Sequence, residues 1–378
     1  MTRTARRRSS LRPGALALLV VAALAAACGS PPERSDSGAD IVRIGLSPYF
    51  EYQPWVIADE LGLDEQQGID LQFTSIESTQ TAAVAARRGD IDLVPSCHSC
   101  AFPFYKEIPE LRDFMITNQF KGFIVVGRTG QTDTFEELSA SIGPDAAKER
   151  ILHGLRGKTF VIQRAGYEAL LVAALDQVGM TIDDIEIVDM PDDSAAALAF
   201  TSGTGDYYIG SLPQEARLLQ EPDRFVNVGG TDILGPAGLW YSTMLATEDW
   251  LNDNHDTVLR LMAVWYRTMR YLDEQPQRTL PMFTEAINTA AASDLPLSEV
   301  EYIVAELEFF PTLQQAAETV YNPESELYFR QSVDFYAKGN ADKLPEDFVV
   351  DDVVVDDRYF DELRRNQELV SWIDSPLS

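Results

Sequence analysis

The chain has 378 residues, of which 45% are hydrophobic and 24% are charged, and its formal net charge is −30. This length suits two domains rather than one small core, and the composition is that of a globular protein. The acidic balance argues against nucleic acid as a partner, because binding to phosphates needs a basic face. Net charge alone identifies no small ligand.

The N-terminus has the parts of an export signal. Residues 1–14 contain five arginines and no acid, an apolar run of 13 residues extends from Ala15 to Ala27, and Cys28 follows. The run is too short to span a bilayer as a helix. Residues 24–28, LAAAC, resemble a bacterial lipobox, in which the cysteine is diacylated, although Ala25 stands where leucine is commonest. We predict a lipoprotein signal peptide over residues 1–27, a lipid on Cys28 and a flexible tether over residues 28–40; an ordinary signal peptide with a chance cysteine is the alternative.

Strands and helices then alternate, and the pattern occurs twice. The first set comprises strands over 41–48, 68–76 and 90–97, with helices over 54–63 and 78–89. The second set comprises strands over 158–166, 184–190 and 206–213, with helices over 167–180 and 193–203. An offset of 116 residues aligns Gly89-Asp90 with Gly205-Asp206. Such alternation implies right-handed crossovers and parallel-rich sheets flanked by helices, and two similar units imply two α/β lobes.

The remaining segments connect the lobes and complete the first one. Residues 120–130 carry the chain into the second lobe, and residues 235–251 carry it back. Further helices are expected over 256–272, 298–310 and 324–339, and a short helix near the C-terminus. We therefore expect lobe 1 to comprise residues 41–122, lobe 2 to comprise residues 123–236, and residues 237–378 to hold the return crossover, the rest of lobe 1 and the C-terminal helices.

Candidate ligand-binding residues follow from this topology. Ligands of open α/β sheets bind beyond the carboxyl ends of the strands, so two facing lobes would form a cleft there. The residues expected to line it are Tyr49, Phe50, Glu51, Tyr52, Trp55, Ser78, Thr79, Gln80, Cys97, His98, Ser99, Gln163, Arg164, Tyr167, Ser211, Gln214, Trp240 and Tyr241. Aromatic walls stack planar groups or hold cations. Glu51 and Glu168 could balance an amine, and Arg164 could bind an anion. An organic ligand with a ring or an amine is favoured over a small oxyanion; core packing is the alternative for each aromatic residue.

Cys97 and Cys100 flank His98 in the segment PSCHSC. If Cys28 carries lipid, an even pair of cysteines remains outside the cytoplasm, where a close pair is usually oxidised. A zinc site needs a fourth ligand and usually a second paired motif, which the sequence lacks. A redox centre needs a thiol with a lowered pKa, and nothing else supports one. We predict a structural disulfide between Cys97 and Cys100, with no metal and no cofactor.

No sequence signature of an enzyme is present: there is no G-x-S-x-G, no P-loop and no H-E-x-x-H. The order and spacing of three stretches instead resemble a known family: VRIGLSPYFEYQPWVIADELGLDEQQGIDLQF (42–73), AAVAARRGDIDLV (82–94) and LRGKTFVIQRAGYEALLVAALDQVGMTIDDIEIVDM (155–190). They are similar to type II periplasmic binding proteins, in particular the subgroup serving ABC importers of nitrate, sulfonates, taurine and thiamine pyrimidine precursors.

The resemblance implies a two-lobed Venus-flytrap fold that closes on a small molecule and docks on an importer permease. It also implies a monomeric lipoprotein outside the cytoplasm, held at the bacterial cell membrane by its lipid. Two departures bear on the ligand. QRAGY, from Gln163 to Tyr167, and PSCHSC stand where small Gly/Ser/Thr-rich loops are common in nitrate and sulfonate binders. The alternative is an enzyme on the same fold, similar to thiamine-pyrimidine synthases, that uses the Cys/His loop.

Overall fold

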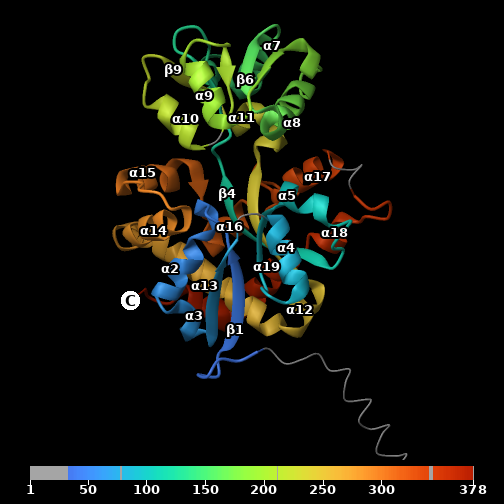
Figure 1. The fold of residues 1–378 in the computed structure, drawn as a ribbon, viewed down its shortest axis with the longest axis vertical. Coiled ribbons are helices and arrows are strands. Elements are labelled where there is room, and N and C mark those ends of the chain that lie inside the picture. Colours follow the sequence, from blue (N-terminus) through green and yellow to red (C-terminus); the bar gives the residue numbers. More distant parts are fainter. Residues whose placement is uncertain (1–32, 77–78, 211, 340–343, 378) are drawn as a thin grey trace, which may run out of the picture.

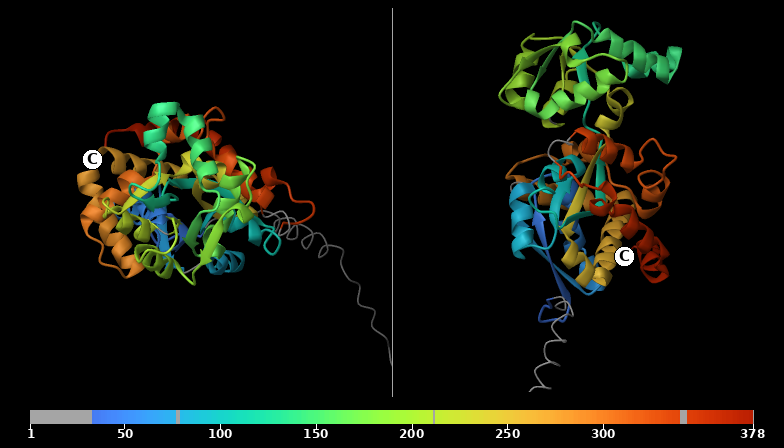
Figure 2. Two further views of the ribbon diagram at one scale, coloured as in Figure 1. Left: turned by 90° about the horizontal axis from the view of Figure 1, so that it is seen from above. Right: turned by 90° about the vertical axis from the view of Figure 1, so that its right-hand side faces the viewer.

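The computed structural model describes residues 33–76, 79–210, 212–339 and 344–377. These residues form two lobes stacked along the longest axis of the molecule (Figure 1). The side view in the right panel of Figure 2 shows the same stacking. Strands β4 (Leu111–Phe120) and β10 (Trp240–Thr247) run from the larger lobe toward the smaller one. None of the helices in the described ranges combines the length and the apolar character that crossing a bilayer requires.

The larger lobe holds two sheets. Strands β1 (Asp40–Leu46) and β2 (Ile69–Ser75) pair in parallel. The second sheet has the order β11-β4-β10-β3, with β3 (Val94–Cys97) and β11 (Glu308–Phe309) at its edges, and all its pairings are antiparallel. A parallel bridge between Ile44 and Leu93 connects the two sheets. The C-terminal ends of β1 and β3 therefore lie at the same edge, which is the edge expected to bear the site.

The helices of the larger lobe come from both ends of the described chain. They are η2 (Phe50–Tyr52), α2 (Pro54–Glu60), α3 (Leu63–Gln66), α4 (Thr79–Arg88), α5 (His98–Ala101), η3 (Phe102–Phe104), α12 (Glu248–Asp253), α13 (His255–Glu274), α14 (Pro276–Ala291), α15 (Leu297–Tyr302), η6 (Ile303–Leu307), α16 (Leu313–Glu318), α17 (Phe329–Gly339), α18 (Val350–Val353), α19 (Asp356–Arg365) and α20 (Gln367–Asp374). Helix α13 is buried along most of its length, and its Trp265 packs against Trp55 of α2 with ring centroids 4.6 Å apart. This contact lies in the main core of the lobe.

The smaller lobe holds one five-stranded sheet of order β7-β6-β8-β5-β9. Its strands are β5 (Val125–Arg128), β6 (Thr159–Ile162), β7 (Glu186–Asp189), β8 (Tyr207–Tyr208) and β9 (Phe225–Gly229). Its helices are α6 (Phe135–Ile142), α7 (Pro144–Gly154), α8 (Arg164–Asp176), η4 (Ile182–Asp184), α9 (Asp193–Thr201), α10 (Leu212–Leu219), α11 (Thr231–Leu234) and η5 (Gly235–Gly238). Strand β6 is parallel to β7 and β8, whereas β5 is antiparallel to β8 and β9. The predicted two-lobed α/β architecture is confirmed.

An apolar cluster joins the two lobes. Leu212 of α10 packs with Ile303 and Leu307 of η6, and Phe50 and Phe120 surround them. We call these five residues the junction cluster. The chain crosses between the lobes directly beside it, at Gly122, where an added Cβ would lie 2.3 Å from the Phe120 ring and 2.9 Å from Leu212. Since real Cβ atoms essentially never approach that closely, the close packing at the crossing requires glycine.

One predicted helix is wrong over its last three residues. The apolar pattern over 298–310 predicts a continuous helix, but the helical segments α15 and η6 end at Leu307, and the chain continues into β11. Glu308 and Phe309 then pair with Phe120 and Gln119 of β4. This pairing turns the Glu308 side chain into the protein, as described below.

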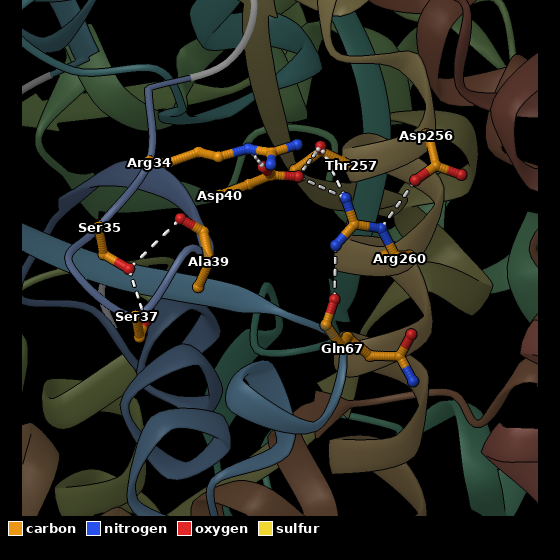
Figure 3. A network of polar contacts seen from close by, with 9 residues as sticks. All are labelled: Arg34, Ser35, Ser37, Ala39, Asp40, Gln67, Asp256, Thr257 and Arg260. Carbon is orange, nitrogen blue, oxygen red and sulfur yellow. Dashed lines mark hydrogen bonds and ion pairs between the residues drawn. The ribbon is translucent and has the colours of Figure 1, made fainter.

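Polar contacts fix the start of β1 to α13 (Figure 3). The Asp40 carboxylate accepts hydrogen bonds from the Thr257 hydroxyl at 3.0 Å and from the Arg260 guanidinium at 2.6 Å, and Arg34 lies 3.4 Å away. Arg260 also donates to the backbone oxygen of Gln67. Ordered contacts with the larger lobe thus extend into the range expected to be a tether, residues 28–40.

Candidate ligand-binding site

Buried carboxyl groups gather where the lobes meet. Glu51 lies on η2, directly after β1, and burial raises the pKa of its carboxyl to about 7, although hydrogen bonds from its own backbone and from Ser242 oppose the shift. Glu308 of β11 is buried and accepts a hydrogen bond from the Asn118 side-chain amide. Burial and then the charge of Glu51 raise the pKa of Glu308 well above its usual range, while Lys121 acts in the opposite direction.

The smaller lobe adds its own acids. Glu215 of α10 is buried, and the backbone N–H of Gly210 donates to its Oε1 at 3.2 Å. Burial raises the pKa of Glu215 well above its usual range, and the charge of Asp193 adds to the shift. The Tyr167 hydroxyl donates to Asp193 at 2.8 Å. The charge of Glu215 also acts on Tyr302 of α15, so the acids of the smaller lobe face the larger one.

Aromatic rings border the same region. The Phe123 ring contacts Phe120, Trp240 and Tyr167 edge-on, with centroids 5.0, 5.2 and 6.3 Å apart. Trp240 in turn packs edge-on against Tyr336 of α17 at 5.8 Å. The junction thus combines carboxyl groups with aromatic rings, and both kinds of group attract positive charge.

Comparisons with known proteins agree with this architecture. Residues 148–279 match the family model described as NMT1/THI5 like. The putative binding protein YtlA of Bacillus subtilis (strain 168) is 24% identical over 247 residues, which are 62% of this chain and 66% of that relative. The match spans just under two thirds of the relative's length.

Solved structures extend the likeness to most of the chain. The periplasmic aliphatic sulphonate binding protein SsuA of Escherichia coli has a TM-score of 0.59 at 14% identity, over 83% of this chain and 91% of that one. The periplasmic nitrate-binding protein NrtA of Synechocystis PCC 6803 has a TM-score of 0.54 at 13% identity, over 92% of each. The chain has the fold of the type II periplasmic binding proteins. The resemblance seen in the sequence is confirmed.

The type II periplasmic binding-protein fold also carries catalysis. The desulfurization enzyme DSZB shares it, with a TM-score of 0.53 at 12% identity, over 86% of this chain and 99% of that one. The fold alone therefore does not separate a binding protein from an enzyme, and the side chains of the site must do so.

Three residues predicted to line the cleft of this binding-protein fold belong to the core instead. Trp55 is fully buried against Trp265. Tyr52 is buried, and its hydroxyl donates to the Ser96 backbone oxygen at 2.5 Å. Tyr241 is buried as well, and its hydroxyl donates to Leu327. Each of these rings packs among other side chains of the lobe, as large amphipathic side chains do in a core. None of the three is exposed at the surface where a ligand would bind.

The charged pair Arg164 and Glu168 lies at the surface. Arg164 opens α8 and is exposed, and its guanidinium lies 2.5 Å from the Glu168 carboxylate one turn later. An exposed ion pair of this kind is weak. Of the two acids predicted to balance an amine, Glu51 is the one among the junction acids.

The other predicted residues lie around the same edges. Tyr49 is 53% exposed, and Phe50 stacks on Phe283 at 5.9 Å. The Thr79 hydroxyl donates to Pro95 at 3.3 Å, Gln80 is exposed, and the Gln214 amide donates to Ser194 at 3.2 Å. Gln163 is the N-cap residue of α8, and Ser99 belongs to α5. Ser78, Ser211 and the predicted lipid site Cys28 lie outside the described residues.

The structure joins Cys97 and Cys100 by a disulfide at the start of α5. His98 between them is buried in the larger lobe, where its ring stacks on Phe329 at 5.9 Å. Burial, and then the charge of Arg330, lowers the pKa of His98 to about 3. His98 is therefore a neutral side chain packed inside the larger lobe, and its contact with a ligand in the cleft stays a prediction.

Several junction residues were not among the predicted ones. Glu215 follows the predicted Gln214 by one position, and a buried acid directly after a strand was a usable signal. Glu308 gave no such signal, because it lay inside a predicted helix. Phe120 and Phe123 were recognised only as part of the crossing segment.

Proposed function

We propose that the chain is an extracytoplasmic solute-binding protein that captures a small organic cation between its lobes and delivers it to an ABC importer. The observation that carries the ligand class is the set of buried acids at the junction, Glu51 and Glu308 on the larger lobe and Glu215 on the smaller one. Buried carboxylates are costly unless a positive charge or strong donors compensate them. A ligand with an ammonium or guanidinium group supplies both.

The binding-protein architecture supports the transport part of the proposal. In this fold a ligand between two lobes can shift the molecule toward a closed form, which a permease can distinguish from the open one. The export signal and the lipobox-like LAAAC segment favour a protein tethered to the outer face of the bacterial cell membrane through Cys28. The charge of the chain, −30, agrees with the absence of nucleic acid from the proposed partners.

Catalysis by the Cys/His loop is less well supported than binding. A cysteine nucleophile must be a thiolate, and the sulfur of Cys97 is bonded to Cys100. His98 is buried, and its ring packs on Phe329, so it is shielded from solvent.

A thermal-shift screen tests the proposal. The purified full-length protein is mixed with a panel of organic amines, quaternary ammonium compounds and guanidines, and with a second panel of sulfonates, nitrate and taurine. We expect melting temperature to rise with ligand concentration for a member of the first panel, because a ligand that binds only the folded state stabilises it. Chromatography should recover that compound unchanged.

The variants Glu51→Gln and Glu168→Gln sharpen the screen. Glu51→Gln removes a junction charge and should abolish most of the shift. Glu168→Gln removes an equal charge from a residue that is already paired with Arg164, so it should leave the shift intact. A response confined to sulfonates or nitrate would overturn the ligand class, and conversion of the compound would overturn the binding function.

A further inference from the structure

Three side chains from distant parts of the sequence meet inside the larger lobe. His98 comes from α5, Asp113 from β4 and Asp356 from the first turn of α19. Their relative exposures are 1%, 0% and 0%. One potential ligand atom from each lies within 4.8 Å of the other two, and His98 Nε2 is 3.6 Å from Asp113 Oδ2. This group is separate from the acids at the junction.

The polar atoms of this group lack the hydrogen bonds that burial demands. Within the described ranges, no donor reaches the ring nitrogens of His98 or the four carboxylate oxygens in good hydrogen-bond geometry. The polar neighbours of the carboxyl groups are each other, the Thr243 hydroxyl beside Asp113 and the backbone of Asp356. Two adjacent buried carboxyl groups are costly unless a proton or a positive charge compensates them, so the set suits a cation held between the three side chains.

The nearest cationic side chain does not supply that partner. Arg330 acts electrostatically on both aspartates, but its guanidinium donates to Asp351 and Asp357, each at 2.8 Å, and to the Val354 backbone oxygen at 3.1 Å. Its donors are thus directed at the surface side of α18 and α19. The space between the imidazole and the two carboxylates remains without a positive group.

We propose that His98, Asp113 and Asp356 bind one divalent transition-metal ion in the interior of the larger lobe. One imidazole nitrogen and two carboxylate oxygens are ligands that Zn²⁺ and Mn²⁺ accept, whereas Ca²⁺ and Mg²⁺ prefer oxygen alone. Two carboxylates balance the charge of the ion. The Thr243 hydroxyl lies beside Asp113 and is the neutral oxygen best placed to complete the coordination.

The ion would link three separate elements of the larger lobe. It ties the loop closed by the Cys97–Cys100 disulfide to a central strand and to the C-terminal helix α19. The disulfide restricts the turn that carries His98, which keeps the imidazole oriented toward the aspartates. Because the three ligands come together only in the folded chain, binding of the ion stabilises the fold.

Metal titration of the purified full-length protein tests the proposal. The protein is treated with a chelator, dialysed, and titrated with Zn²⁺, Mn²⁺ or Ca²⁺ against a competing chelating indicator while melting temperature is followed. We expect one equivalent of Zn²⁺ or Mn²⁺ to bind and to raise the melting temperature, and Ca²⁺ to have no effect at the same concentration. No bound equivalent, or an equal response to Ca²⁺, would overturn the proposal.

Two variants separate a metal from the main rival, a proton shared between the two carboxyl groups. Asp356→Asn should weaken Zn²⁺ binding at least about 100-fold and remove the thermal shift. Asp351→Asn removes an exposed acid that also contacts Arg330 but is no ligand, and it should keep both. If a shared proton stabilises the pair instead, Asp356→Asn would be as stable as the parent, and neither protein would respond to metal. Should Asp356→Asn not fold, the titration of the parent protein still decides.

Discussion

Replacing Glu51 by glutamine should change how the stability of the protein depends on pH. Glu51 sits at the junction with a carboxyl whose pKa burial raises from 4.5 to about 7. In the unfolded chain this group loses its proton near its ordinary value, whereas in the fold it keeps the proton until pH is near 7. Glutamine has a similar shape, is always neutral and therefore mimics the protonated acid.

The pKa difference sets the size and sign of the effect. Between pH 4.5 and 7 the folded state binds more protons than the unfolded state, so the free energy of unfolding falls as pH rises and levels off above 7. A shift from 4.5 to about 7 corresponds to about 3 kcal/mol. Relative to the parent, the Glu51→Gln protein should gain about that amount between pH 4.5 and pH 8.

Urea denaturation at pH 5 and pH 8 measures this difference directly, because the two proteins are compared with each other at each pH. Glu168→Gln serves as the control and should follow the parent protein. A bound organic cation should show the complementary effect: its affinity for the parent rises as Glu51 ionises, about tenfold per pH unit below 7. Parallel pH profiles of the parent and the Glu51→Gln protein would show that this carboxyl is not held protonated in the fold.

Three further predictions concern other parts of the chain. Protein from the native envelope should contain no alkylatable thiol at Cys97 or Cys100, because the two sulfurs are bonded to each other; two free thiols by mass spectrometry would contradict this. Cys28→Ser should release the protein from membranes, since two acyl chains are needed for stable attachment, and retention after a salt wash would contradict it. Asp40→Asn should lower the free energy of unfolding by about 1–3 kcal/mol, because Thr257 and Arg260 lose a charged acceptor; urea denaturation with an unchanged midpoint would contradict this.

The sequence predicts the parallel strands well because their signal is local. Strands β2, β6 and β7 fall within the predicted ranges, and β1 starts one residue before its range, since each is a short apolar run bounded by turn residues. The repeated order of strands and helices then implies two lobes. Both inferences need only neighbouring residues and general rules of chain connection.

Features that depend on contacts between distant segments could not be predicted from the sequence. Glu308 continues an apolar pattern that favours helix, and only its pairing with Phe120 makes it part of a strand. Asp113 follows His98 by 15 residues, but Asp356 lies 243 residues further along the chain, so no spacing rule could group the three. The sequence motif around the two cysteines contains His98 but neither Asp113 on β4 nor Asp356 on α19.

The predicted site residues differ from one another in exposure. Glu51 was selected as a counter-charge for an amine, and it lies among the junction acids. Trp55 was selected for the same loop, but it starts a helix whose apolar face packs on α13. The position of a residue in the sequence indicates that it lies near an edge of the sheet. The direction of its side chain determines whether it contacts a ligand or packs in the core.

The junction cluster has a consequence for how tightly any solute is held. Leu212 of the smaller lobe packs with Ile303 and Leu307 of the larger lobe, so a separation of the lobes would expose these side chains to water. The contact therefore enlarges the fraction of molecules that are already closed, and apparent affinity is the intrinsic affinity scaled by that fraction. A substitution at position 212 or 303 would therefore change the apparent affinity for a solute, even though neither side chain needs to touch that solute.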